Sequence, residues 1–326
     1  MQNMDARIVV LGTGGTIAGT AASTSDHTGY TAARLGVAQL LAPLGPGVDP
    51  AVEAEQVLQL DSKDMDAAGW QRLATRVAHH LAREEVQGVV ITHGTDTLEE
   101  TAYFLHRVLA PRKPVVMTAA MRPATALQTD GPQNLRDALT VARWPGAGGV
   151  VAVVAGRVIG AADLRKVHTY RLDAFSAGDA GPIAQVEQAQ LRVHRGWPLG
   201  AGVSRGEALQ VDVAHWPWVA VVLSHAGADA RLVDALVGAG VQGLVVAATG
   251  NGTVHAALGT ALQRALDAGV PVVRSTRCVN GALVGDGADG IGAEDPAVWP
   301  VLAGAGALTP VQARIELMLR LLARRQ

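Results

Sequence analysis

Short aliphatic runs recur along this chain of 326 residues, with stretches of helical pattern between them. Runs of this length, bounded by glycine and polar residues, indicate buried strands, and their alternation with helices indicates a largely parallel sheet. The runs lie at residues 8–11, 89–92, 115–118, 150–154, 219–223, 244–247 and 270–273. The sequence therefore predicts an α/β protein.

The amino-acid composition limits both the core and the binding partners. Hydrophobic residues make up 49% of the chain but aromatic residues only 3%, so the core must be built from alanine, valine and leucine, which suits buried parallel strands. The net charge of −2 gives no electrostatic basis for binding nucleic acid, which needs clustered lysine and arginine. We interpret the basic residues at 320–325 as the last turn of a helix, where cations meet the negative end of the helix dipole.

The chain carries no sequence signal for export or for a membrane. Residues 1–5 lead directly into the first predicted strand without the pattern of a signal peptide, and no stretch reaches the roughly 18 unbroken apolar residues of a membrane span. The single cysteine, Cys278, cannot form a disulfide framework, and we interpret it as a small core side chain. We therefore expect a cytoplasmic protein.

A stretch rich in glycine and proline interrupts the pattern of strands and helices between residues 191 and 217. Such a break is typical of a domain boundary. We predict an N-terminal domain over residues 1–190 with a larger, mostly parallel sheet, a linker over 191–217, and a smaller, flavodoxin-like α/β domain over 218–326. The second domain should end in an amphipathic helix from Pro310 onward.

Two of the predicted strands end in a glycine turn that carries a threonine. The first strand runs into Gly-Thr-Gly-Gly-Thr at residues 12–16, and the second runs into His-Gly-Thr-Asp at residues 93–96. Glycine permits positive φ and a close approach of the main chain, and a hydroxyl at the end of a strand can be presented as a nucleophile. We expect the two turns to face each other across one small pocket, which favours an amide-cleaving threonine enzyme.

A helix should begin directly after the second turn. Thr97 and Glu100 have the spacing of a capping box, in which each side chain satisfies a free main-chain amide. The positive end of this helix would then lie close to any anionic group bound at the turn. A threonine nucleophile also needs a base, and the candidates are Asp96 and Lys166, the lysine only if its surroundings favour the neutral form.

Other enzyme classes lose their main support. A dinucleotide-binding motif that starts at Gly12 would need glycine or alanine where the chain has Ile17. The sequence contains no phosphate-binding loop, serine elbow or zinc motif, so we expect neither a nucleotide cofactor nor a metal. We interpret His93 as a structural residue at a strand end, and His79 and His80 as solvated residues of a helix.

With these motifs the chain resembles the bacterial L-asparaginase and glutaminase family, the type with a Thr-Gly-Gly-Thr-Ile-Ala-Gly turn near the N-terminus. The matching blocks run in family order over nearly the whole chain. They are residues 13–19, 30–31, 61–65, 92–103, 120–123, 130–132, 134–135, 166, 250–252 and 274–277. The resemblance implies a two-domain α/β enzyme, usually a homotetramer built from intimate dimers, that hydrolyses asparagine and often glutamine without a cofactor.

The resemblance also implies catalytic roles for five residues. Thr16 matches the primary nucleophile and Tyr30 a residue hydrogen-bonded near it on a mobile loop, while Thr95, Asp96 and Lys166 match a second triad. Nothing in the sequence decides which threonine attacks first. We favour Thr16, which would form a β-aspartyl ester that water then cleaves, with Thr95 and Lys166 handling protons and water.

Substrate contacts follow from the same resemblance. Ser62 matches the residue that holds the α-carboxylate of the substrate, and Asp96 lies where the α-amino group is bound. Main-chain amides around Gly15 and Thr95 and the carbonyl of Ala120 would complete the site. The predicted substrate-binding set is Gly15, Asp61, Ser62, Gly94, Thr95, Asp96 and Ala120.

The chain departs from the periplasmic branch of the family at two places. Lys63 stands where that branch commonly has glutamine, and a cation there disfavours a substrate ammonium, so either the side chain turns away or amino-group binding is changed. The segment 280–289 lacks the glutamate that a neighbouring subunit supplies in that branch, and Asp286 or Asp289 would have to replace it. The small polar segment 20–29 is either a surface loop or a lid that brings Tyr30 into place.

Three functions are compatible with these motifs. The first is an amidohydrolase acting on asparagine. The second is a glutaminase, or an amidase for a related β- or γ-amide, and the two departures support it. The third is a non-enzymatic protein that senses an amino acid, but the presence of the complete hydrolytic set argues against it.

Overall fold

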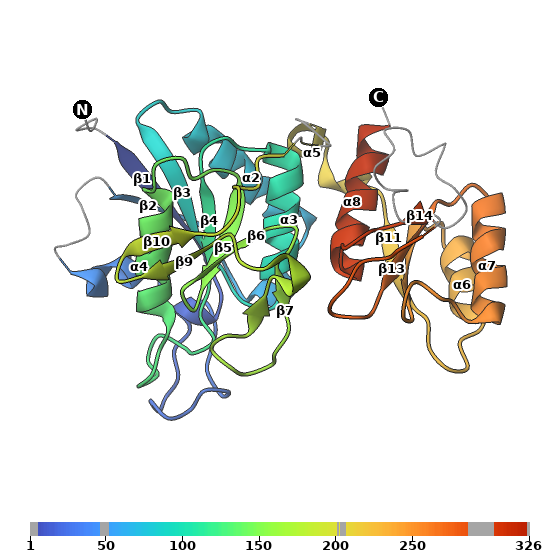
Figure 1. Cartoon of the computed structure of the whole chain (residues 1–326), viewed down its shortest axis with the longest axis horizontal. Helices are drawn as coiled ribbons and strands as arrows, with labels where there is room; N and C mark the ends of the chain where they lie inside the picture. The colour runs from blue at the N-terminus through green and yellow to red at the C-terminus, as the bar shows by residue number, and fades with distance from the viewer. Residues whose placement is uncertain (1–5, 46–51, 201, 203–206, 286–302, 325–326) are drawn as a thin grey trace. The chain divides into compact units, whose positions relative to one another are not determined.

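The computed structural model describes residues 6–45, 52–200, 202, 207–285 and 303–324. The chain divides into two units, residues 1–202 and residues 203–326. This division falls inside the stretch predicted as a linker, although β10 (Gln190–Val193) still pairs within the sheet of the first unit. Each unit has helices packed on a single main sheet (Figure 1).

The first unit is built on an eight-stranded mixed sheet in the order β10-β9-β6-β5-β4-β3-β1-β2. Its strands are β1 (Arg7–Gly14), β2 (Val52–Leu60), β3 (Val86–Thr92), β4 (Val115–Thr118), β5 (Val150–Val154), β6 (Arg157–Gly160), β9 (Ala184–Glu187) and β10. Strands β2, β1, β3, β4 and β5 pair in parallel, and β5, β6, β9 and β10 pair in antiparallel fashion. A separate small ladder joins β7 (Arg165–Lys166) to β8 (Phe175–Ser176).

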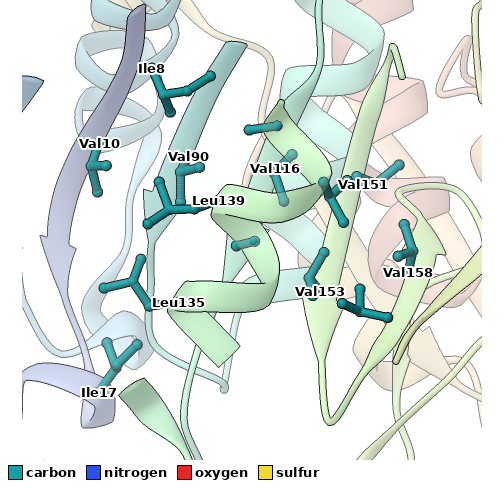
Figure 2. Packing of buried hydrophobic residues seen from close by; sticks show 14 of the residues in the cluster. Ile8, Val10, Ile17, Val90, Val116, Leu135, Leu139, Val151, Val153 and Val158 are labelled. Atoms are coloured by element: carbon teal, nitrogen blue, oxygen red, sulfur yellow. The ribbon is translucent and has the colours of Figure 1, made fainter. Parts of the chain in front are cut away.

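Helices cover both faces of this sheet. Helix α4 (Gly131–Ala142) packs on β3, β4 and β5, while α2 (Ala67–Leu81) and α3 (Leu98–Leu109) pack against each other and against the opposite face (Figure 1). Figure 2 shows Leu135 and Leu139 of α4 lying against Val90, Val116 and Val151 of the strands. A sheet buried on both faces requires strands that are aliphatic on both sides, which is the pattern that the sequence carries.

The second unit contains a parallel sheet in the order β11-β12-β13-β14. Three strands form its body, β11 (Val219–Leu223), β12 (Gly243–Ala248) and β13 (Val272–Thr276), and β14 (Ala303–Gly304) adds two residues. Helices α6 (Arg231–Gly238) and α7 (Ala256–Asp267) pack together on one face, and α8 (Pro310–Ala323) covers the other (Figure 1). The described residues also contain two short α-helices, α1 (Val37–Leu41) and α5 (Glu207–Gln210).

The predicted fold class is confirmed, with a larger sheet in the first unit and a small parallel sheet in the second. The strands with aliphatic runs all form, and α8 begins at Pro310 as predicted, with a capping box between Thr309 and Gln312. Strand β2 was missed because polar residues such as Glu53 and Glu55 break its apolar pattern. The short antiparallel strands β6, β9 and β10 were also missed.

Three local predictions were wrong. Thr97 does precede α3, but its hydroxyl donates to the Ser62 carbonyl at 2.8 Å and does not cap the helix. Cys278 is exposed, because it follows the end of β13 in an irregular segment. His80 is buried and its Nε2 lies 2.7 Å from the Glu55 carboxylate, because α2 packs this face against β2. His79 is exposed, as predicted.

Candidate active site

The two glycine turns lie side by side because their strands are neighbours. Strands β1 and β3 pair in parallel with Gly12 opposite Thr92, so both carboxyl ends reach the same edge of the sheet. Gly15 has φ 78°, and a Cβ atom built on it would clash with the main chain of Gly94. Since L side chains rarely adopt that conformation, only glycine lets the turns pack main chain on main chain. The Gly15 amide donates to the Leu60 carbonyl at 2.9 Å, which also ties the turn to the end of β2.

The first hydroxyl centre consists of Thr16 and Tyr30. Thr16 begins a short 3-10 helix, η1 (Thr16–Ala18), and is buried, with its Oγ1 2.7 Å from the Tyr30 hydroxyl. Tyr30 comes from the segment that a bridge between Thr20 and Thr31 closes into a loop. A Cβ atom on Gly19 would lie 2.8 Å from the Tyr30 ring, so this glycine is what allows the ring to lie close to the turn.

The second hydroxyl centre consists of Thr95, Asp96 and Lys166. The Lys166 ammonium donates to Thr95 Oγ1 at 3.0 Å and to Asp96 Oδ1 at 2.6 Å. Thr95 is buried, whereas the Asp96 side chain is about half exposed. Lys166 lies on β7, and its main-chain amide donates to the Glu99 carboxylate of α3 at 2.6 Å. An amine that contacts a buried hydroxyl can accept or return its proton when neutral.

Ser62 is held directly against the second turn. It begins the 3-10 helix η3 (Ser62–Asp64) after β2, and its hydroxyl accepts a bond from the Asp96 amide at 3.2 Å. A Cβ atom on Gly94 would clash with the Ser62 side chain, so this second glycine also serves a close approach. The structure thus brings Ser62 and both glycine turns to one place.

Lys63 is turned toward acidic neighbours of its own segment. Its ammonium lies 2.6 Å from the Asp61 carboxylate and 3.4 Å from that of Asp64, and the side chain is largely exposed. The hydrogen bond that Lys63 donates to the Asp61 carboxylate raises the pKa of Lys63 above its usual value. Of the two alternatives that the sequence left open, the geometry matches the one in which Lys63 turns to another partner.

Ala120 is buried in a turn that the start of α4 holds in place. The Asp130 carboxylate accepts bonds from the amides of Met121 and Arg122 at 2.9 and 3.0 Å. Asn134 donates to the Ala119 carbonyl at 2.9 Å. Asp130 and Asn134 fall in the blocks that carry the family resemblance, but sequence reasoning gave them no role. Their contacts indicate that they fix the main chain around Ala120.

Burial changes the ionisation of two groups near the turns. His93 is fully buried, and desolvation lowers its pKa to about 4, so the ring is neutral at neutral pH, with Nδ1 2.8 Å from the Gly94 carbonyl oxygen. This fits the structural role predicted for it. Burial also raises the pKa of Glu99 to about 7, with the neighbouring Glu100 charge adding to the effect. No sequence signal pointed to Glu99, since its burial arises from packing.

Two further observations concern only the described part of the chain. It contains no cluster of three or more histidine, cysteine, aspartate or glutamate residues arranged to hold a metal ion. None of its helices is both long and apolar enough to cross a membrane.

The sequence also pointed to residues in the second unit, namely the turn at 250–252, which matches a family block, and the two aspartates proposed to replace the missing glutamate. The turn at 250–252 is closed by the bridge between Thr249 and Thr253, and Asn251 donates to the Val284 carbonyl at 2.9 Å. Asp286 and Asp289, the two candidates to replace the missing glutamate, lie outside the described residues.

Comparison with known proteins agrees with this arrangement over both units. Residues 7–198 match the family described as asparaginase, N-terminal, and residues 218–326 match the glutaminase/asparaginase C-terminal domain. The chain belongs to the L-asparaginase and glutaminase family. It is therefore a hydrolase of the L-asparaginase type, as the sequence motifs predicted.

Members of the asparaginase family from several bacteria are similar along almost the whole chain. L-asparaginase 2 of Bacillus subtilis is 35% identical over 322 residues, which cover 96% of this chain and 82% of that protein. The glutaminase-asparaginase of Pseudomonas fluorescens is 34% identical, with 97% and 86% covered. A solved structure of a probable cytoplasmic L-asparaginase from Campylobacter jejuni has a TM-score of 0.86 at 34% identity, with 97% and 95% covered.

Proposed function

We propose that this enzyme hydrolyses L-asparagine to L-aspartate and ammonia through a threonine nucleophile. The observation that carries the proposal is the meeting of two threonine turns, of which one presents a hydroxyl paired with Tyr30 and the other a hydroxyl paired with Lys166. The asparaginases named among its relatives support the choice of substrate.

In the proposed reaction, Thr16 attacks the side-chain amide carbon of asparagine. Its hydroxyl proton passes through Tyr30 to the amide nitrogen, which leaves as ammonia, and a β-aspartyl ester remains on Thr16. Water then attacks the ester carbon, releases aspartate and returns a proton to the threonine oxygen. Lys166 and Thr95 assist this second half by accepting and passing the proton of the water, with Asp96 holding the lysine.

Substrate binding in this proposal uses the groups gathered around the turns. The Ser62 hydroxyl would hold the α-carboxylate, and the exposed carboxylate of Asp96 would hold the α-ammonium. Amides near Gly15 and Thr95 would stabilise the oxyanion, at about 3 kcal/mol for each donor, and the carbonyl of Ala120 would accept from the amide of the substrate. Gly94 shapes the turn, and Asp61 acts through its pair with Lys63.

Glutamine is the second candidate substrate. A glutaminase-asparaginase is among the relatives, and the Lys63–Asp61 pair changes the charge beside Ser62, where the amino-acid end of the substrate would bind. Membership of a hydrolase family leaves the sensing hypothesis without support. A homo-oligomer, a dimer or a dimer of dimers, and a cytoplasmic location remain part of the proposal.

The test is ammonia release by the purified enzyme from L-asparagine and L-glutamine in parallel, with Thr16→Ala as the control. A strong preference for asparagine and a dead variant support the proposal. Faster turnover of glutamine selects the second candidate. Release of ammonia from neither amide contradicts both.

A further inference from the structure

Lys166 is held at two points by one segment of the chain. Its ammonium contacts Thr95 and Asp96, and its main-chain amide donates to Glu99 Oε2 at 2.6 Å. Glu99 lies in the first turn of α3, directly after the turn that carries Thr95. The side chain and the main chain of Lys166 therefore both bond to residues 95–99, at the start of α3. The proposed reaction makes no use of Glu99.

The strand that carries Lys166 needs this second contact. Strand β7 has only two residues, and its ladder to β8 pairs Arg165 with Ser176 and Lys166 with Phe175, outside the eight-stranded sheet. Such a short antiparallel pair is weak on its own. The Glu99 carboxylate supplies a direct hydrogen bond between the backbone of this strand and α3.

The surroundings of Glu99 shift the pKa of its carboxyl. Burial raises the pKa of its carboxyl to about 7, the Glu100 charge raises it further, and the Lys166 amide and the charges of Arg165 and Lys166 lower it. An ionised carboxylate accepts a stronger hydrogen bond from an amide than a protonated carboxyl does. The hydrogen bond from the Lys166 amide to Glu99 therefore becomes stronger as the pH rises through neutrality.

We propose that Glu99 is a positioning residue that sets the Lys166 amine against the Thr95 hydroxyl during amide hydrolysis. It touches neither substrate nor reacting atoms, and its effect is carried through the backbone of Lys166. This role rests on the proposed function, because it presumes that Lys166 and Thr95 handle protons.

Two substitutions at Glu99 and one at its neighbour test this role. Glu99→Ala removes the acceptor and should lower kcat for asparagine by about 10- to 100-fold, because small misplacements of a catalytic group are costly, while KM changes by less than about threefold. Glu99→Gln keeps a side-chain carbonyl that can accept from the Lys166 amide, so it should restore most of kcat. Glu100→Ala removes a carboxylate from the same helical turn and should leave kcat near wild type.

A second readout separates positioning from a general loss of structure. The Lys166 amide should exchange its hydrogen faster in Glu99→Ala than in the wild type or in Glu99→Gln, while exchange in the eight-stranded sheet stays unchanged. The kcat of the wild type should also contain an ionisation near pH 7 that is absent in Glu99→Gln.

The inference on Glu99 and the proposed function fail in different ways. If the wild type releases no ammonia from either amide, the proposed function is contradicted, and with it any role of Glu99 in that reaction. If the wild type is active but Glu99→Ala keeps its kcat and pH profile, only the inference on Glu99 is overturned. A lower kcat with unchanged exchange at the Lys166 amide also overturns it.

Discussion

The two threonine centres are built from the same kind of turn but are held in different ways. Thr16 faces another hydroxyl, that of Tyr30, on a loop connected to the body by a few bonds, such as the one from the Ala124 amide to the Gly19 carbonyl. Thr95 faces the amine of Lys166, which donates to Asp96, while the main-chain amide of the same lysine donates to Glu99. A pair of hydroxyls with one partner on a loop suits a nucleophile that must admit a substrate, and a charged cluster on fixed elements suits the proton transfers that activate water.

The largest effect should come from removing the Thr16 hydroxyl of the first hydroxyl centre. Thr16→Ala should lower kcat for asparagine by about 10⁴-fold or more, because the residual rate comes only from binding and oxyanion stabilisation. Ammonia release and circular dichroism measure activity and folding. Thr20→Ala, a threonine of the same segment, serves as the matched control and should stay active. Near-normal turnover in Thr16→Ala would remove Thr16 from the reaction.

The next largest effect on kcat should come from replacing Lys166 of the second hydroxyl centre. Lys166→Met should lower kcat by about 10²- to 10⁴-fold, the range expected for loss of an acid–base group. Lys166→Arg should not restore activity, because a guanidinium keeps its proton at every working pH. Steady-state ammonia release tests both variants. Full recovery with arginine would show that the lysine contributes charge alone.

Beside the second hydroxyl centre, Glu99 should make the stability of the protein depend on pH. The raised pKa of Glu99 means that the folded state retains a proton between about pH 4.5 and pH 7 that the unfolded state has lost, so the wild type loses stability across this window. Relative to wild type, Glu99→Gln should therefore gain about 3 kcal/mol in the free energy of unfolding between about pH 4.5 and pH 8. Urea unfolding at several pH values measures this. A difference that does not change with pH would contradict the burial of an ionisable Glu99.

The smallest effect should come from the partner on the loop. Tyr30→Phe keeps the ring packed near Gly19 but removes the hydroxyl that contacts Thr16, so kcat should fall by about 10²-fold, at the low end of the range for a lost acid–base group and less than for Lys166→Met. Parallel measurement of kcat and KM checks the order. A larger loss for Tyr30→Phe than for Lys166→Met would reverse the comparison between the centres.

The sequence predicted those parts of the molecule that local patterns determine. Aliphatic runs marked the buried parallel strands, and the glycine turns marked the approach of Gly15 to Gly94. Strand β2 escaped because its polar side chains suit a sheet edge, where Glu53 and Glu55 pair with arginines. Patterns of period two or 3.6 do not report such ion pairs, since their partners come from elsewhere in the chain.

The candidate site divides in the same way. Thr16 and Thr95 could be found from their turns, and Lys166 could be named as a candidate base. Its pairing with Thr95, 71 positions away in the sequence, was expected only from the family resemblance. Glu99 was not found at all, because its burial and raised pKa arise from the packing of β7 beside α3. Capping at Thr97 was mispredicted for a related reason, since a tertiary contact with Ser62 replaces the local one.

The comparison of the two centres is tested most directly by trapping the covalent intermediate. Lys166→Met should slow the attack of water on the ester, so the variant is incubated with L-asparagine, quenched in acid, digested and examined by mass spectrometry. The account predicts one added aspartyl group on the peptide that contains Thr16, and none when Thr16→Ala is combined with Lys166→Met. An aspartyl group on the peptide that contains Thr95 would contradict the assignment of the nucleophile.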